Sequence, residues 1–137
     1  MFFNKKDENN LEINFVKIGA LLIHAAKIDE NFSKEEEEII KKTLLNLGAN
    51  KNNLLSLISK AKQCEEDANQ ILDFTKEIKK LKEEDKIKII KSLWKIIYSN
   101  KDADVYETNL MRRLAGLLYV DSKTMGNIKE EIQREKF

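Results

Sequence analysis

Residues 87–120 constrain the fold of this chain more than any other stretch. The first half is apolar on nearly every side of a helix, through Ile87, Ile89, Ile90, Leu93, Trp94, Ile96, Ile97 and Tyr98. A helix of this kind has to be surrounded by other elements, so it is predicted to lie at the centre of a helical domain. The apolar pattern breaks at residues 99–101, and a second amphipathic helix is predicted to start near Asp104.

The rest of the chain also has helical periodicity. At 137 residues it is long enough for one domain with a sizeable core. It has no proline and only four glycines, so little interrupts helices, and 36% of its residues are charged. We predict an all-α fold, a single compact bundle of about seven helices. The expected helices cover about residues 11–27, 33–47, 52–62, 67–81, 83–99, 104–120 and 121–132.

Several local signals refine this scheme. Residues 1–10 are expected to form a flexible amino-terminal segment, and residues 11–137 the helical domain. Gly48 is a natural stop for the second helix, and Asp67 is a candidate cap for the fourth. Small residues predict close helix contacts at two places, Gly19 with Ala20 and Ala115 with Gly116.

Charge and cysteine content exclude several functions. The net charge is +1, from 25 basic and 24 acidic residues, so no global field favours nucleic acid or anionic lipid. Cys64 is the only cysteine, which excludes an intrachain disulfide and a cysteine-based zinc site. No apolar run reaches the roughly 20 residues that span a bilayer, and no signal peptide is visible. We expect a cytoplasmic protein without a membrane span and without a nucleic-acid partner.

Two polar segments share a pattern. Residues 29–36 read D-E-N-F-S-K-E-E, and residues 100–107 read N-K-D-A-D-V-Y-E. An offset of 71 places Asp29 on Asn100 and Glu36 on Glu107, and it aligns the flanking apolar residues. Each unit therefore reads as a helix, a short loop and a capped helix. Two such pseudo-repeated helix hairpins, packed together, would bring both polar loops close to each other.

The polar side chains of these loops are candidate metal ligands: Asp29, Glu36, Asn100, Asp102, Asp104 and Glu107. Oxygen ligands suit Ca²⁺, Mg²⁺ or Mn²⁺. Neither loop is an EF-hand, since the twelfth position is Ile40 when counted from Asp29 and Arg113 when counted from Asp102. A purely structural interpretation has stronger support from the sequence. The pairs Ser33/Glu36 and Asp104/Glu107 both fit capping boxes, and acids at helix starts need no metal.

The second unit continues over residues 106–118 as Y-E-T-N-L-M-R-R-L-A-G-L-L. This stretch resembles the TerB-like family of tellurite-resistance proteins and related bacterial stress-protein domains. Their hairpin pattern, A-D-G-x-h-x-x-x-E, occurs twice, and the second copy continues as Y-E-x-x-L-h-R-R-h-A-x-L-h. The resemblance covers the chain from about Leu11 to Ile132. It implies a compact bundle of about seven helices whose acidic loop residues hold a divalent cation.

The chain departs from that family pattern at three positions. Asn100 stands in place of the usual Asp, Lys101 in place of the following Gly, and Glu30 in place of the first-loop Gly. Replacing a carboxylate by an amide removes one negative charge, and the adjacent lysine lowers the attraction for a cation further. These departures favour a weakened site or a purely structural one.

The functional prediction is a non-enzymatic stress-associated module. No glycine-rich phosphate loop, Ser-His-acid set or Cys-His pair is visible, and the lone His24 reads as a packed or surface residue. The expected cofactor is a divalent cation or none. The alternative is a protein-interaction or adaptor domain, similar to a co-chaperone, in which the acids act only as helix caps. A protein partner of unknown identity is expected, and a homodimer stays open.

Overall fold

The computed structural model describes residues 5–27, 33–99 and 105–136, and the side chains of residues 12–27, 33–99 and 109–135. The described part of the chain contains seven α-helices, the short 3-10 helix η2 and no strand. The prediction of an all-α fold is therefore confirmed. The elements are α1 (Lys5–Ala26), α2 (Lys34–Asn46), η2 (Lys51–Asn53), α3 (Leu54–Asp67), α4 (Leu72–Ile78), α5 (Glu83–Tyr98), α6 (Val105–Leu117) and α7 (Ser122–Lys136).

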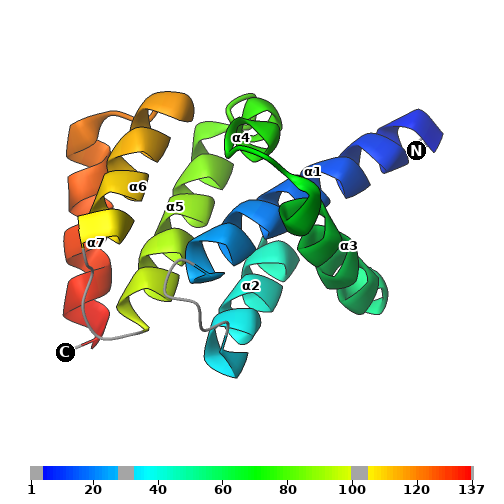
Figure 1. Cartoon of the computed structure of the whole chain (residues 1–137), viewed down its shortest axis with the longest axis horizontal. Helices are drawn as coiled ribbons and strands as arrows, with labels where there is room; N and C mark the ends of the chain where they lie inside the picture. The colour runs from blue at the N-terminus through cyan, green and yellow to red at the C-terminus, as the bar shows by residue number, and fades with distance from the viewer. Residues whose placement is uncertain (1–4, 28–32, 100–104, 137) are drawn as a thin grey trace.

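Helix α5 occupies the central position that its apolar pattern predicts. It packs against α1, α2 and α7, and Figure 1 shows it between the α6 and α7 pair and the remaining helices. The side chains of Ile89, Ile90 and Leu93 are fully buried. The consecutive residues Ser92, Leu93 and Trp94 are also buried. Successive residues of a helix point in different directions from its axis, so all three can be buried only because neighbours surround α5.

Helix α1 is the second central element. It packs against α2, α3, α4 and α5, and the consecutive residues Ala20, Leu21 and Leu22 have no exposed surface. The predicted close contact at Gly19 is confirmed, because a Cβ atom added there would lie 2.8 Å from Cβ of Ala61 on α3. Only a glycine lets the two backbones approach to this distance.

The corresponding prediction for Gly116 is wrong. Gly116 is exposed, and within the described residues no heavy atom lies within 4 Å of a Cβ added to it. Its neighbour Ala115 is buried. Successive helical residues are about 100° apart around the axis, so Ala115 faces the core while Gly116 faces outward.

Several helix boundaries differ from the sequence-based prediction. Helix α4 ends at Ile78 rather than near residue 81, and α7 ends at Lys136 rather than near residue 132. Helix α1 starts at Lys5 rather than near residue 11, because no glycine or proline stops the helix before that point. Helix α3 continues through Cys64 to Asp67. The prediction that Asp67 caps the fourth helix is therefore wrong. Helix α4 begins at Leu72, and the residue at its N-cap position, Ile71, forms no side-chain capping hydrogen bond.

The C-terminus of α2 is closed by a glycine in the left-handed region. Gly48 has φ +108°, and its N–H donates to the Leu45 carbonyl at 3.0 Å. The next amide, of Ala49, donates to the Leu44 carbonyl at 2.9 Å. These two bonds form the Schellman arrangement, which confirms the predicted stop at Gly48.

Helix α6 ends in the same way, but with a tyrosine in the glycine position. Tyr119 has φ +57°. Its backbone amide donates to the Gly116 carbonyl at 3.3 Å, and the backbone amide of Val120 donates to the Ala115 carbonyl at 2.9 Å. Helix α6 begins 71 residues after α2 begins and ends 71 residues after α2 ends. This spacing equals the offset in the sequence, although the relation of the two hairpins as repeats stays a prediction.

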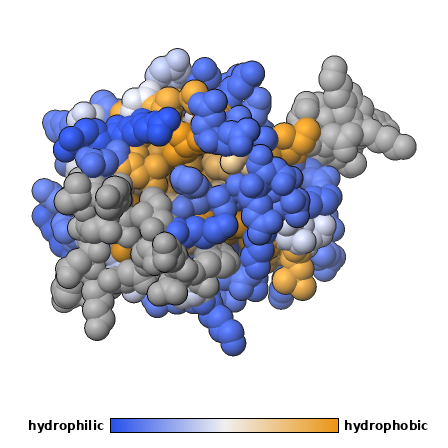
Figure 2. Space-filling view, viewed as in Figure 1, coloured by the Kyte–Doolittle hydropathy of each residue, from blue (hydrophilic) through white to orange (hydrophobic). Residues whose placement is uncertain are grey.

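Most of the face shown in Figure 2 is hydrophilic, with apolar atoms reaching the surface in its upper middle part. In the part of the chain that the structure describes, no helix combines the length and apolarity needed to cross a membrane.

Candidate functional site

The structure places only one of the six predicted ligand side chains. Asp29, Asn100, Asp102 and Asp104 lie outside the described residues. Glu107 belongs to helix α6 by its backbone, but its side chain also lies outside the described part. The side chain of Glu36, in the first turn of α2, is described, and the geometry of the candidate site is built from it.

Glu36 and Ser33 form the capping box that the sequence predicts. The Ser33 hydroxyl accepts a hydrogen bond from the Glu36 amide at 3.1 Å, and Oε1 of Glu36 accepts one from the Ser33 amide at 2.9 Å. Two amide donors at the start of α2 are satisfied in this way. The structural role of Glu36 is therefore confirmed.

The burial of Glu36 is the feature that the sequence did not reveal. Its exposed fraction is 0%, whereas its neighbour Glu35 is exposed. Glutamate is almost never fully buried unless it is paired. The helix dipole favours a negative charge at this position, and the Ser33 amide supplies a hydrogen bond, but neither interaction requires the side chain to leave the surface.

The helix ends next to the predicted loops lie in one region of the bundle. Helix α2 packs against α1 and α5, and Figure 1 shows its start in the lower part of the view, together with the C-terminal ends of α1 and α5. Because helix C-termini carry partial negative charge, the ends of α1 and α5 add a negative contribution to this region.

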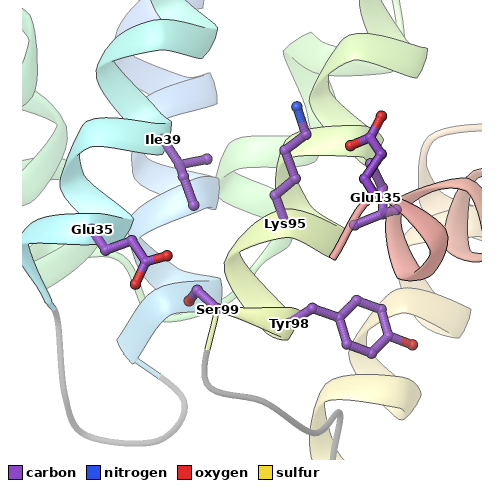
Figure 3. Close-up of a pocket in the computed structure, with 7 residues that line it drawn as sticks. Glu35, Ile39, Lys95, Tyr98, Ser99 and Glu135 are labelled. Atoms are coloured by element: carbon purple, nitrogen blue, oxygen red, sulfur yellow. The ribbon is translucent and has the colours of Figure 1, made fainter. Parts of the chain in front are cut away.

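A small pocket opens beside Glu35 in the same region (Figure 3). Its volume is about 220 Å³, and it is lined by Glu35, Ile39, Lys95, Tyr98, Ser99, Ile132 and Glu135. In Figure 3 the Glu35 carboxylate reaches from α2 toward Ser99 at the end of α5, while Glu135 lies on α7 across the pocket. Sequence reasoning missed this pocket because its residues come from three helices far apart in the chain.

The described residues alone do not complete a metal centre. Among them, no group of three or more His, Cys, Asp or Glu side chains is arranged to hold a metal ion. Glu36 is thus a single buried carboxylate in the described part, and the predicted ligand set extends beyond that part.

A separate ionic cluster joins α1 to α3. Lys27 Nζ lies 2.7 Å from Oε1 of Glu65, and His24 Nδ1 lies 3.6 Å from its Oε2. The hydrogen bond to Glu65 is the main cause that raises the pKa of Lys27. The His24 ring also lies 6.2 Å from the ring of Phe74. The cluster was not predicted, because Glu65 lies 38 residues from Lys27 along the chain.

These observations define a class of protein, a single helical bundle with a buried carboxylate in the capping box of one helix. The family model described as "Tellurite resistance protein TerB" matches residues 16–130. The chain belongs to the TerB family. Neither the curated proteins nor the solved structures gave a match.

Proposed function

We propose that this TerB-family chain is a non-enzymatic module that binds a divalent cation at the end of the bundle where α2 begins. The observation that carries the proposal is the complete burial of the Glu36 carboxylate. Burying an ionised carboxylate is costly, and proteins offset that cost with hydrogen bonds, counter-charges or metal ions. Mg²⁺, Ca²⁺ and Mn²⁺ are the cations that carboxylate oxygens favour.

The start of α7 shows that an acidic residue can cap a helix of this protein while it stays exposed. At the start of α7, Oδ1 of Asp121 accepts a hydrogen bond from the Thr124 amide at 2.7 Å, and Asp121 is exposed. An acid can therefore cap a helix of this protein without burial. The burial of Glu36 therefore supports a role beyond capping, and cation binding is the role that we propose.

The proposed ligand set joins Glu36 to Glu107 and to the polar residues that precede each of them. Those further residues are Asp29, Asn100, Asp102 and Asp104. They offer carboxylate and amide oxygens, the donor set that a hard divalent cation requires. A cation bound by them would hold the two hairpins together at one end of the bundle.

The test is the melting temperature of the protein, purified in EDTA and then titrated separately with Mg²⁺, Ca²⁺, Mn²⁺ and Zn²⁺. A ligand that binds only the folded state raises stability by RT ln(1 + [L]/Kd), so the melting temperature should rise with the concentration of an oxygen-preferring ion. Zn²⁺ serves as the comparison for a site without sulfur or nitrogen ligands.

Two variants decide whether Glu36 is a ligand. Glu36→Gln keeps a side-chain oxygen for the capping box but loses the charge, so it should abolish the cation-dependent rise while still folding. Glu35→Gln makes the same change at the adjacent exposed residue and should keep the rise. If no ion raises the melting temperature of the wild-type protein at millimolar concentration, the cation proposal is wrong and the acids are helix caps.

A protein-interaction role is the second candidate. It is supported by two large hydrophobic side chains that are exposed to solvent, Leu72 with an exposed fraction of 45% and Tyr119 with 71%. Tyrosine is a typical anchor of protein interfaces, and exposed apolar patches mark interaction sites. An adaptor would bind its partner with or without a cation, which distinguishes the two roles.

A further inference from the structure

A groove runs between α4 and the C-terminal end of α6. Its volume is about 350 Å³, and its lining residues are Leu72, Thr75, Lys76, Lys79, Gly116, Leu117 and Tyr119. The α4 residues follow helical spacing and form one face of that helix. Figure 2 shows apolar atoms at the surface in the region between α4 and α6, framed by hydrophilic residues.

Gly116 keeps part of this groove open. Within the described residues, no heavy atom lies within 4 Å of a Cβ added to Gly116. Its missing side chain therefore leaves space rather than allowing two helices to meet. The groove lies between this open position and the side chains of Leu72 and Leu117.

Tyr119 occupies its place in the groove at a conformational cost. Its φ of +57° is the left-handed region, which disfavours residues with a Cβ, and the equivalent position at the end of α2 is Gly48. With 71% of its surface exposed, the Tyr119 side chain gains little from packing inside the protein. A strained and exposed aromatic residue points to a function at the surface.

The charged side chains that line the groove are all positive. Its lining contains two lysines and no acidic residue. Lys79 Nζ lies 5.7 Å from the centroid of the Tyr119 ring, a cation–π distance. Neither Lys76 nor Lys79 forms an ion pair with any described residue, in contrast to Lys27 and Lys91, which each pair with a glutamate.

We propose that this groove docks an acidic segment of a partner protein. One apolar side chain of that segment enters between Leu72, Leu117 and Tyr119, and flanking carboxylates pair with Lys76 and Lys79. The proposal rests on the interaction role described above and is independent of the cation. The apolar lining and the absence of arginine from it favour an apolar, acidic peptide over a phosphate group.

The probe is a panel of fluorescein-labelled synthetic peptides, each with one central leucine, phenylalanine or tryptophan flanked on both sides by glutamates. Control peptides carry lysine instead of glutamate, or serine instead of the apolar residue. Fluorescence anisotropy with the full chain gives the affinity, in EDTA and with added Mg²⁺. Acidic peptides with an apolar centre should bind best, with the same affinity in both buffers.

Charge reversal tests whether the two lysines determine the preference for acidic peptides. Lys76→Glu combined with Lys79→Glu should weaken binding of the acidic peptide about tenfold or more and strengthen binding of the lysine peptide. The matched control, Lys42→Glu combined with Lys88→Glu, makes the same charge change outside the groove and should leave the affinity unchanged. Tyr119→Gly should weaken binding while raising the melting temperature, which separates loss of the anchor from loss of the fold.

Location is decided by NMR spectra of the ¹⁵N-labelled chain during peptide titration. The expected shifts lie at the amides of α4 and the end of α6. The groove proposal is overturned if no acidic peptide binds, if charge reversal leaves the affinity unchanged, or if the shifts lie elsewhere. Shifts elsewhere would keep an interaction role and remove only the groove. A dimer seen by sedimentation, with concentration-dependent NMR shifts at these same amides, would assign the groove to a second copy of the chain instead.

Discussion

The hydroxyl oxygens of Thr43 and Ser92 lie 2.5 Å apart in the buried contact between α2 and α5. Each hydroxyl also reaches a carbonyl of its own helix, Thr43 that of Ile39 at 2.7 Å and Ser92 that of Lys88 at 3.0 Å. Two oxygens this close need a proton between them, so one hydroxyl donates to the other. Because the pair has two protons for three contacts, that hydroxyl cannot donate fully to its own carbonyl as well. This buried pair connects the helix that carries Glu36 to the central helix.

Removing both hydroxyls should cost less than the two single losses together. Thr43→Val and Ser92→Ala should each lower the free energy of unfolding by about 1 kcal/mol. In the double variant no buried hydroxyl is left facing an apolar partner, so we expect a coupling energy of at least about 0.5 kcal/mol. Urea unfolding followed by the fluorescence of the buried Trp94 measures all four proteins. Strictly additive losses would show that the two hydroxyls do not interact.

Two glycine-to-alanine changes should act in opposite directions. Gly19→Ala places a Cβ 2.8 Å from the Ala61 Cβ and should destabilise the protein by roughly 1–3 kcal/mol through overpacking. Gly126→Ala lies in the exposed interior of α7, with no described atom within 4 Å of the new Cβ. It should stabilise by about 0.5–1 kcal/mol through helix propensity.

Thermal and urea unfolding compare these variants. Ala61→Gly in the Gly19→Ala background makes room for the added methyl group and should recover part of the loss. If Gly19→Ala were as stable as the wild-type protein, α1 and α3 would not be in the tight contact described.

The helix ends at Gly48 and Tyr119 should respond oppositely to substitution. Tyr119→Gly removes a left-handed non-glycine residue and should raise the free energy of unfolding by about 1 kcal/mol. Gly48→Ala introduces such a residue and should lower it by a similar amount. Urea unfolding of both variants checks this expectation. A destabilised Tyr119→Gly variant would mean that the tyrosine side chain contributes more by packing than its backbone strain costs.

The contribution of Asp121 to stability should depend on pH. The hydrogen bond from the Thr124 amide is the main cause that lowers the pKa of Asp121. A lowered pKa in the folded state gives stability that is present above the unfolded-state pKa and is lost as pH falls through the folded-state pKa. The wild-type protein should therefore exceed Asp121→Ala in stability at neutral pH, and the difference should shrink in acid. A difference that stays constant from neutral to acidic pH would contradict this role.

The candidate site was only partly accessible from the sequence. The spacing of Ser33 and Glu36 predicts the capping box, because this pattern depends on residues within one turn. The burial of Glu36 depends on how α2 packs against α1 and α5, and a local sequence pattern cannot predict this packing. One signal of the α4–α6 groove was present, since the offset of 71 places Tyr119 on Gly48. The tyrosine at this position indicates backbone strain only once the structure shows that α6 ends in the same Schellman arrangement as α2.

The sequence by itself determined the all-α class, the central position of α5 and the closeness of α1 to the helix beside Gly19. These follow from apolar periodicity, from the absence of proline and from one small residue on a buried face. The tertiary structure decided that Gly116 faces outward and that Leu72 stays exposed. Helical periodicity states which residues share a face, whereas the burial of a face depends on which other helices cover it.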